Sequence, residues 1–118
     1  MENISPSELA HQAAKHALSK KGYNIKILNL KDISSVCDYF VIISGAADMQ
    51  VRAIANAIED ELRESGIKPY HIEGQTEGSW ILIDYIDVVV HVFYEPTREF
   101  YSLEKLWGDA PIEEVVED

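Results

Sequence analysis

The stretch that most constrains the fold is a run of strand-forming residues between Gly78 and Tyr94. Its two arms, residues 80–85 and 87–94, are filled with Val, Ile, Tyr, Phe and Trp, the residue types that pack best on a pleated surface. A single residue, Ile86, separates the arms. The stretch therefore predicts a β-hairpin, and the rest of the chain has to supply what covers it.

The hairpin divides into two unlike faces, because successive side chains of a strand point to opposite sides. We expect Asp84 to lie opposite Asp87 across a tight turn, which places Trp80 opposite His91. The aliphatic face then carries Ile81, Ile83, Val88, Val90 and Val92. The mixed face carries Trp80, Leu82, Asp84, Asp87, Val89, His91 and Phe93.

The aliphatic face predicts a covering helix, whereas the mixed face has two interpretations. An indole, an imidazole and two carboxylates on one side of a hairpin suit contact with a partner better than they suit a dry core. Alternatively, another segment of the same chain covers this face and Trp80 is an ordinary core residue. The sequence leaves both interpretations open.

The remaining chain predicts an α/β fold, with a mixed sheet of about five strands flanked by helices. An apolar stripe between Val51 and Leu62 predicts the clearest helix, capped by Asp48. The other expected elements are a helix from Ser5 to Lys21, strands over 24–30, 38–44 and 69–73 (an edge strand, because Pro69 lacks a donor), and a short helical segment over 95–106. We expect one domain over residues 1–110, followed by an acidic, disordered tail over 111–118.

The net charge of −11 limits the classes of partner. Phosphate binding needs a basic patch, and ten Lys and Arg residues stand against 21 Asp and Glu residues, so direct nucleic-acid binding is disfavoured. An acidic protein is steered instead toward basic partners. The lone Cys37, the absence of a signal-peptide pattern and the lack of a long apolar run predict a cytoplasmic protein without a membrane partner.

The titratable residues do not predict an enzyme. Asp84 and Asp87 are placed to share a metal ion, and Gly78-Ser79 is similar to a phosphate-binding turn, but the acids follow that turn too closely and no third acid joins them. These acids also suit a tight hairpin turn. The four histidines lack metal-ligand spacing. We therefore expect no catalytic residue, metal or cofactor, and a binding module.

Five short motifs in one order closely resemble the ribosomal silencing factor family, also called the Iojap-like family. They include Asp38-Tyr-Phe-Val-Ile42, Glu73-Gly74 and Trp80-Ile-Leu-Ile-Asp-Tyr85. The remaining two cover residues 87–93 and 98–110. The pattern runs along nearly the whole chain.

The resemblance implies a fold related to nucleotidyl transferases without a retained catalytic site. It implies binding to the large ribosomal subunit through a protein of its intersubunit face, the fourteenth by its conventional number. It further implies a block of subunit joining, repression of translation under nutrient limitation, a link to ribosome biogenesis, and a homodimer when free. A nucleotide-binding enzyme and a ribosome-independent dimeric scaffold remain the alternatives.

The resemblance also assigns partner-binding residues. Four of them belong to the mixed face, namely Trp80, Leu82, Asp84 and His91. The others, with less defined roles, are Tyr39, Tyr85, Arg98 and Tyr101. Two positions depart from the family pattern: Ile86 stands where glycine is usual, which predicts a wider turn, and Ala47 replaces a hydroxyl residue.

Overall fold

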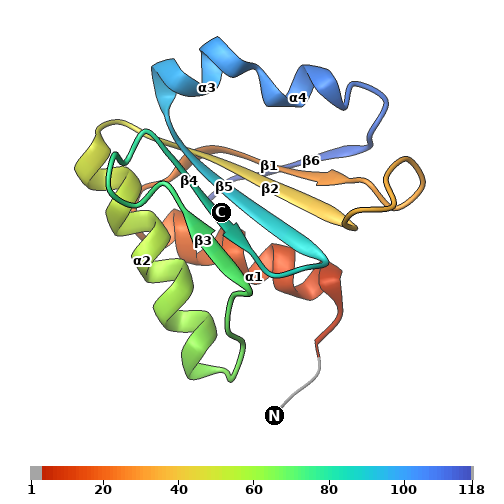
Figure 1. Ribbon diagram of the computed structural model, residues 1–118, viewed down its shortest axis with the longest axis horizontal. Helices are drawn as coiled ribbons and strands as arrows, with labels where there is room; N and C mark the ends of the chain where they lie inside the picture. Colours follow the sequence, from red (N-terminus) through yellow and green to blue (C-terminus); the bar gives the residue numbers. More distant parts are fainter. Residues whose placement is uncertain (1–3, 118) are drawn as a thin grey trace.

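The computed structural model describes residues 4–117, which form a six-stranded sheet with helices on both faces (Figure 1). Along the chain, the elements are α1 (Pro6–Ser19), β1 (Tyr23–Asn29), β2 (Tyr39–Gly45), α2 (Asp48–Glu64), β3 (His71–Glu73), β4 (Trp80–Asp84), β5 (Val88–Tyr94), α3 (Glu95–Tyr101), α4 (Leu103–Leu106) and β6 (Ile112–Val115). The mixed α/β class expected from the sequence is confirmed. None of the described helices has the length and apolar composition that crossing a bilayer requires.

The strands lie in the order β3-β4-β5-β2-β1-β6. β2 and β5 pair in parallel, and the other neighbours pair antiparallel. The short strand β3 lies at an edge, as the proline before it predicts. β5 lies inside the sheet between β2 and β4, so the hairpin is central to the fold rather than appended to it.

The expectation of a disordered tail is wrong for residues 112–115, which form β6 along β1. The Asn29 amide donates to the Pro111 carbonyl at 2.9 Å, and Val115 packs half-buried against the core. His11 of α1 contacts Glu113 at 2.9 Å, which links the strand to the helix layer. Four acidic residues in the last six outweigh the strand-forming Ile112 and Val115 when the tail is judged by its composition. Asp118 lies outside the described residues.

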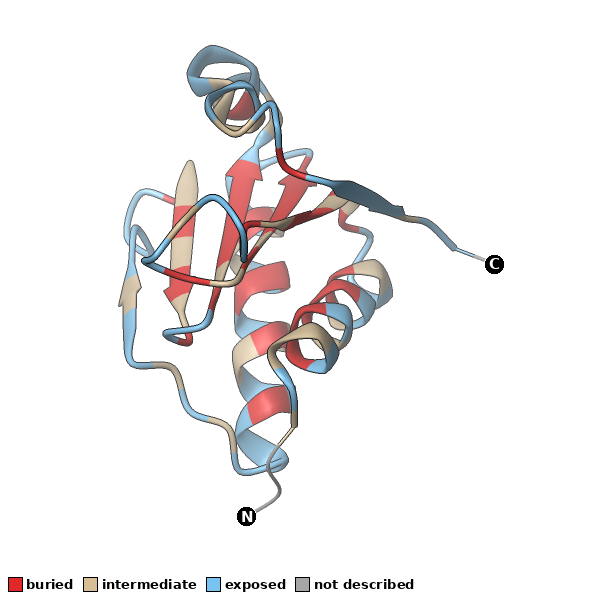
Figure 2. Cartoon of the chain, turned by 90° about the vertical axis from the view of Figure 1, so that its right-hand side faces the viewer, coloured by how far each residue is buried: buried red, intermediate tan, exposed pale blue. Residues whose placement is uncertain are grey.

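The two long helices cover the aliphatic face of the sheet, and Figure 2 shows buried residues on the sides that meet. Small residues on α1 let its backbone approach the strands closely: Ala10, Ala13, Ala14 and Ala17 are fully buried. α2 presents the predicted apolar stripe of Val51, Ile54, Ala55, Ile58 and Leu62. These residues and the aliphatic hairpin face form the main core.

The helix starts agree only in part with the predicted caps. Ser5 and Glu8 form the capping box expected for α1, with reciprocal bonds of 3.1 and 3.2 Å. Asp48 does not cap α2, because the capping position is Ala47, whose side chain has no acceptor. The Asp48 carboxylate instead accepts from Arg52 Nη1 at 2.9 Å, one turn along the helix.

The hairpin register differs by two residues from the expected one. Asp84 pairs with Val89 rather than Asp87, and Trp80 therefore pairs with Phe93 rather than His91. A shift of two leaves every side chain on its expected face, whereas a shift of one would have exchanged the faces.

The wider turn predicted from Ile86 is present and causes this shift. The Asp84 carboxylate accepts the Ile86 amide at 2.7 Å, and the Tyr85 carbonyl accepts the Asp87 amide at 2.9 Å. Ile86 between them has a φ of 75°. A β-branched residue is strained in this region, which glycine adopts without a steric cost.

Candidate partner-binding face

The mixed face of the hairpin belongs to one face of the whole sheet. Part of this sheet face is covered by the chain itself, and the rest is accessible. Over β1 and β2, the segment from α3 to Ala110 forms a second, smaller core in which Leu103 and Trp107 pack on the sheet. Over β4 and β3, Leu82 and Asp84 are half-buried, while His71 and Glu73 are exposed. The covering segment that one interpretation predicts is therefore present over one half of this face, and the other half stays accessible, as the partner-contact interpretation requires.

Trp80 lies at the boundary between these halves and is fixed on three sides. Its ring stacks on Phe93 with centroids 4.8 Å apart and lies against Tyr101 at 5.0 Å. Its indole Nε1 donates to His91 Nδ1 at 3.1 Å. The side chain is half-buried, so an indole in a fixed orientation reaches the surface. A rigid aromatic loses little conformational entropy on contact with a partner.

His91 supports Trp80 from below and is only 3% exposed. Accepting the indole hydrogen requires Nδ1 to be unprotonated, so the neutral ring carries its proton on Nε2. Nε2 is buried and has no hydrogen-bond partner among the described residues. Phe40 lies edge-on at 4.6 Å. Burial lowers the pKa of His91 to about 4, so the imidazole is neutral at physiological pH.

Arg98 lies in a different environment, 6% exposed at the junction of α3 with the strands. Its Nη1 donates to the Asn24 carbonyl at 2.6 Å and to Ser44 Oγ at 2.8 Å, and its Nη2 donates to Glu104 at 2.9 Å. Burial opposes ionisation of Glu104, but the bonds and charge of Arg98 outweigh it and hold the pKa of that carboxyl below its usual value. Arg98 therefore fastens α3 and α4 to the sheet.

Two predicted residues point to the opposite face. Tyr39 and Tyr85 are buried in the main core under α1 and α2, with Lys31 Nζ 5.7 Å above the Tyr39 ring. Burial raises the pKa of Tyr85 far above its ordinary value. Tyr101, by contrast, is 52% exposed beside Trp80. The structure thus brings Trp80, Leu82, Asp84 and Tyr101 together at one surface, with His91 beneath them.

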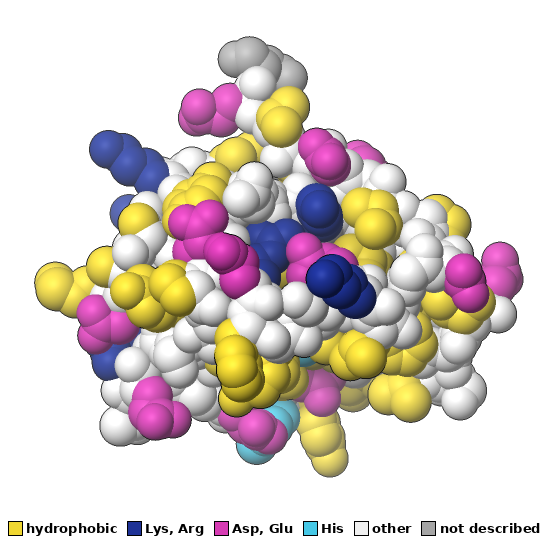
Figure 3. Space-filling view, turned by 90° about the horizontal axis from the view of Figure 1, so that it is seen from above, with side chains coloured by type: hydrophobic (Ala, Val, Ile, Leu, Met, Phe, Trp, Pro, Cys, Tyr) yellow, Lys and Arg dark blue, Asp and Glu magenta, His cyan; other side chains and the backbone are white. Residues whose placement is uncertain are grey.

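A pocket that the sequence does not predict lies between the loop before β4 and α3. Its volume is about 470 Å³, and its lining consists of Glu77, Ser79, Trp80, Pro96, Thr97, Phe100 and Tyr101. The aromatic residues of the 98–107 segment were the available signal, but sequence could not place them beside Trp80. Seen from the α3–α4 side, hydrophobic side chains reach the surface between acidic ones (Figure 3).

Arg52 of α2 holds the loop that forms one wall of this pocket. Its Nε donates to the Gln75 carbonyl at 3.0 Å and its Nη2 to the Thr76 carbonyl at 2.6 Å. The guanidinium packs on Gly78, where an added Cβ would lie 2.9 Å from Cζ. Gly74 has a φ of 88°, and a Cβ there would lie 1.9 Å from the Trp80 carbonyl oxygen, so this position requires glycine.

This face combines apolar contact area with negative charge. The described residues contain no group of three His, Cys, Asp or Glu side chains placed to hold a metal ion. The residues that converge are a fixed indole, an aliphatic side chain and carboxylates, which supply contact area and negative charge.

Comparison with known proteins identifies the family. The family model described as "Ribosomal silencing factor during starvation" matches residues 3–118. The chain belongs to this family.

Ribosomal silencing factor RsfS of Bacillus subtilis is 50% identical over 93 residues, which are 79% of each chain. The silencing-factor fold is also seen in a crystal structure of protein CV0518 from Chromobacterium violaceum, at a TM-score of 0.87 and 31% identity, covering 97% of this chain and 95% of that one. A mouse relative named "Mitochondrial assembly of ribosomal large subunit protein 1" is 29% identical over 115 residues, which are 88% of this chain and 50% of that protein.

Proposed function

We propose that this silencing factor binds the large ribosomal subunit through the face that carries Trp80, Leu82 and Asp84, and that a protein of the subunit's intersubunit face is its direct partner. The observation that carries the proposal is the fixed, partly exposed indole of Trp80 beside an uncovered, acidic half of the sheet. Fixed aromatic anchors of this kind dominate many protein interfaces.

The charge of the protein supports a protein partner rather than direct contact with ribosomal RNA. Asp84 and the exposed Glu73 flank the apolar part of the face, and the whole chain carries a charge of −11. Ribosomal proteins are commonly basic because they contact RNA, so they offer the opposite charge. The names of the relatives, which refer to ribosome silencing and large-subunit assembly, support the large subunit as the target.

A protein bound at the intersubunit face occupies space that the small subunit needs. The consequence that we propose is a non-catalytic block of subunit joining in the cytoplasm, with less translation when nutrients are scarce. We propose that binding at the same site of the large subunit also links the protein to ribosome biogenesis. No chemical step is required, because steric exclusion alone lowers the number of joined ribosomes.

Co-sedimentation with isolated large subunits tests this proposal. We expect Trp80→Ala to weaken binding by about 2 kcal/mol or more, roughly a thirtyfold loss of affinity, because it removes the anchor. Asp84→Asn keeps an oxygen acceptor for the Ile86 amide while it removes the charge, and we expect it to weaken binding less. Asp60→Asn on the exposed side of α2 is the matched control.

The outcome separates the partner from the interface. If the wild type sediments with the subunits and Trp80→Ala sediments equally well, the face is wrong and the partner stands. If the folded wild type does not sediment, the ribosomal proposal is refuted. Thermal melting of each variant shows whether a loss of binding reflects a loss of folding.

A homodimer of the free protein is the competing use of this face, and we propose that both forms exist. Analytical ultracentrifugation of the wild type and of Asp84→Asn measures self-association directly. If the substitution weakens both dimerisation and subunit binding, the two assemblies share the face and exclude each other.

A further inference from the structure

The pocket beside Trp80 has walls that are held in place without a partner. The ring of Tyr101 lies against Trp80 at 5.0 Å and against Phe100 at 5.1 Å, so three aromatic rings follow one another around it. On the other side, Arg52 fixes the loop backbone through the Gln75 and Thr76 carbonyls. The cavity therefore exists before any partner binds.

Phe100 is 81% exposed, which the packing of the fold does not explain. It precedes the residue that ends α3, and Ser102, which follows that helix, has a φ of 46°. The Ser102 amide and hydroxyl donate to the carbonyls of Arg98 and Glu99, so the end of the helix is fixed. The backbone thus holds a large apolar ring in water at the rim of the pocket.

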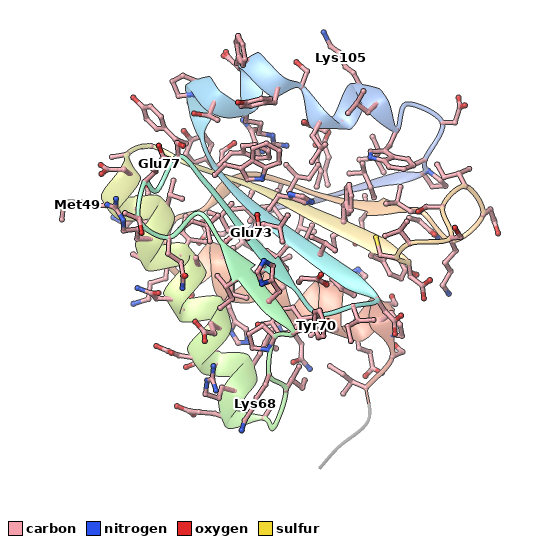
Figure 4. The ribbon with its side chains drawn as sticks, in the orientation of Figure 1. Met49, Lys68, Tyr70, Glu73, Glu77 and Lys105 are labelled. Carbon is pink, nitrogen blue, oxygen red and sulfur yellow. The ribbon has the colours of Figure 1, made fainter. Side chains whose placement is uncertain are left out.

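The charge of the pocket has one sign. Glu77 is its one charged lining residue, and all of the lining lies in the described part of the chain. The nearby cation, Arg52, already donates to two carbonyls and to Asp48. Figure 4 shows Glu77 on the loop near the start of α2, which Met49 marks. Aromatic rings together with a carboxylate favour a cation, because ring faces carry negative electrostatic potential.

We propose that this pocket receives an arginine or lysine side chain of the basic ribosomal protein. The inference rests on the proposed function and specifies which group of the partner is recognised. The cation lies against the aromatic rings, and its charge is neutralised by Glu77. Arginine fits better than lysine, since its planar guanidinium stacks on aromatic rings and donates two parallel bonds to a carboxylate. The pocket thereby adds charge specificity to the apolar contact of Trp80.

Subunit binding by three variants tests the inference. We expect Glu77→Gln to weaken binding about fivefold and Glu77→Lys considerably more, because the second change adds repulsion to the lost attraction. We expect Phe100→Ala to weaken binding by about fivefold to thirtyfold, the range of a partly to fully desolvated cation–π contact. These side chains are exposed, so the fold tolerates their replacement.

Two controls and the salt dependence complete the experiment. Glu99→Gln removes an exposed acid of α3 outside this pocket, and Leu106→Ala removes an exposed apolar side chain of α4; both should bind like the wild type. The affinity of Glu77→Gln should fall less steeply with added salt than that of the wild type. If the wild type binds and both Glu77→Gln and Phe100→Ala bind with the same affinity, the role of the pocket is refuted and the proposed function stands. Equal losses in Glu77→Gln and Glu77→Lys overturn the cationic ligand, and absence of wild-type binding overturns the proposed function itself.

Discussion

The buried His91 makes the stability of this fold sensitive to mild acid. In the folded protein, burial lowers its pKa to about 4, whereas the ordinary pKa of histidine is 6.5. The aromatic rings of Phe40, Trp80 and Phe93 pack around the imidazole, and the shift is caused by burial. As pH falls through 6.5, His91 becomes protonated in the unfolded chain but stays neutral in the folded chain. The free energy of unfolding therefore decreases.

The magnitude follows from linkage between proton binding and folding. At pH 5, the unfolded histidine is almost fully protonated while the folded one is almost fully neutral, and the difference from pH 7 amounts to about 2 kcal/mol. The stability is fully present above pH 6.5 and is lost progressively toward pH 4. His11 acts in the opposite direction, because the Ser7 carbonyl and Glu113 raise its pKa, but it is exposed and its effect is small.

Urea denaturation at pH 7, 6 and 5 measures this effect. His91→Gln keeps an acceptor for the Trp80 indole and cannot titrate. Its free energy of unfolding should therefore lack the decrease of about 2 kcal/mol that His91 causes in the wild type between pH 7 and pH 5. His11→Gln controls for the exposed histidine and should retain the dependence. If His91→Gln shows the same slope as the wild type between pH 7 and 5, the reasoning about the buried imidazole is refuted.

Two further predictions concern stability at pH 7. Ile86→Gly should raise the free energy of unfolding by about 1 kcal/mol, because relief of strain at positive φ exceeds the added entropy of the unfolded chain, whereas Ile86→Ala keeps the strain and should not; equal stability of the two variants in urea would contradict this. Arg98→Met should cost about 3 kcal/mol or more, since Glu104 and Ser44 lose their partner in a buried site. A loss below about 1 kcal/mol in the same assay would show that the ion pair is not what holds α3.

The sequence predicts the parts of this fold that local periodicity determines. The apolar stripe of α2 and the alternation of the hairpin depend on neighbouring residues, and both are confirmed. The strand β6 was missed because its stability comes from pairing with β1, more than 80 residues away in the chain. The cap of α2 was misassigned by one position, because a side-chain acceptor was assumed where the structure has none.

In the candidate site, too, the sequence predicts what local alternation determines and does not predict contacts between distant segments. Trp80, Leu82 and Asp84 share a face by period-two alternation, which sequence alone supplies. Tyr39 and Tyr85 were grouped with them by resemblance, although they point to the other side of the sheet. The contact between Trp80 and Tyr101 depends on how α3 folds back over the strands, and no local pattern encodes that geometry.

The position of β5 has a consequence for how the protein is made. Residues 88–94 pair on one side with β4, which precedes them closely, and on the other with β2, which left the ribosome some 50 residues earlier. Until β5 is synthesised, the nascent chain holds β2 with an open edge, the kind of edge that pairs with other chains. His91 and Phe93, on which Trp80 rests, arrive with the same strand. A chain interrupted before β5 therefore lacks both the strand that closes the open edge of β2 and the two residues that support Trp80 in the proposed binding face.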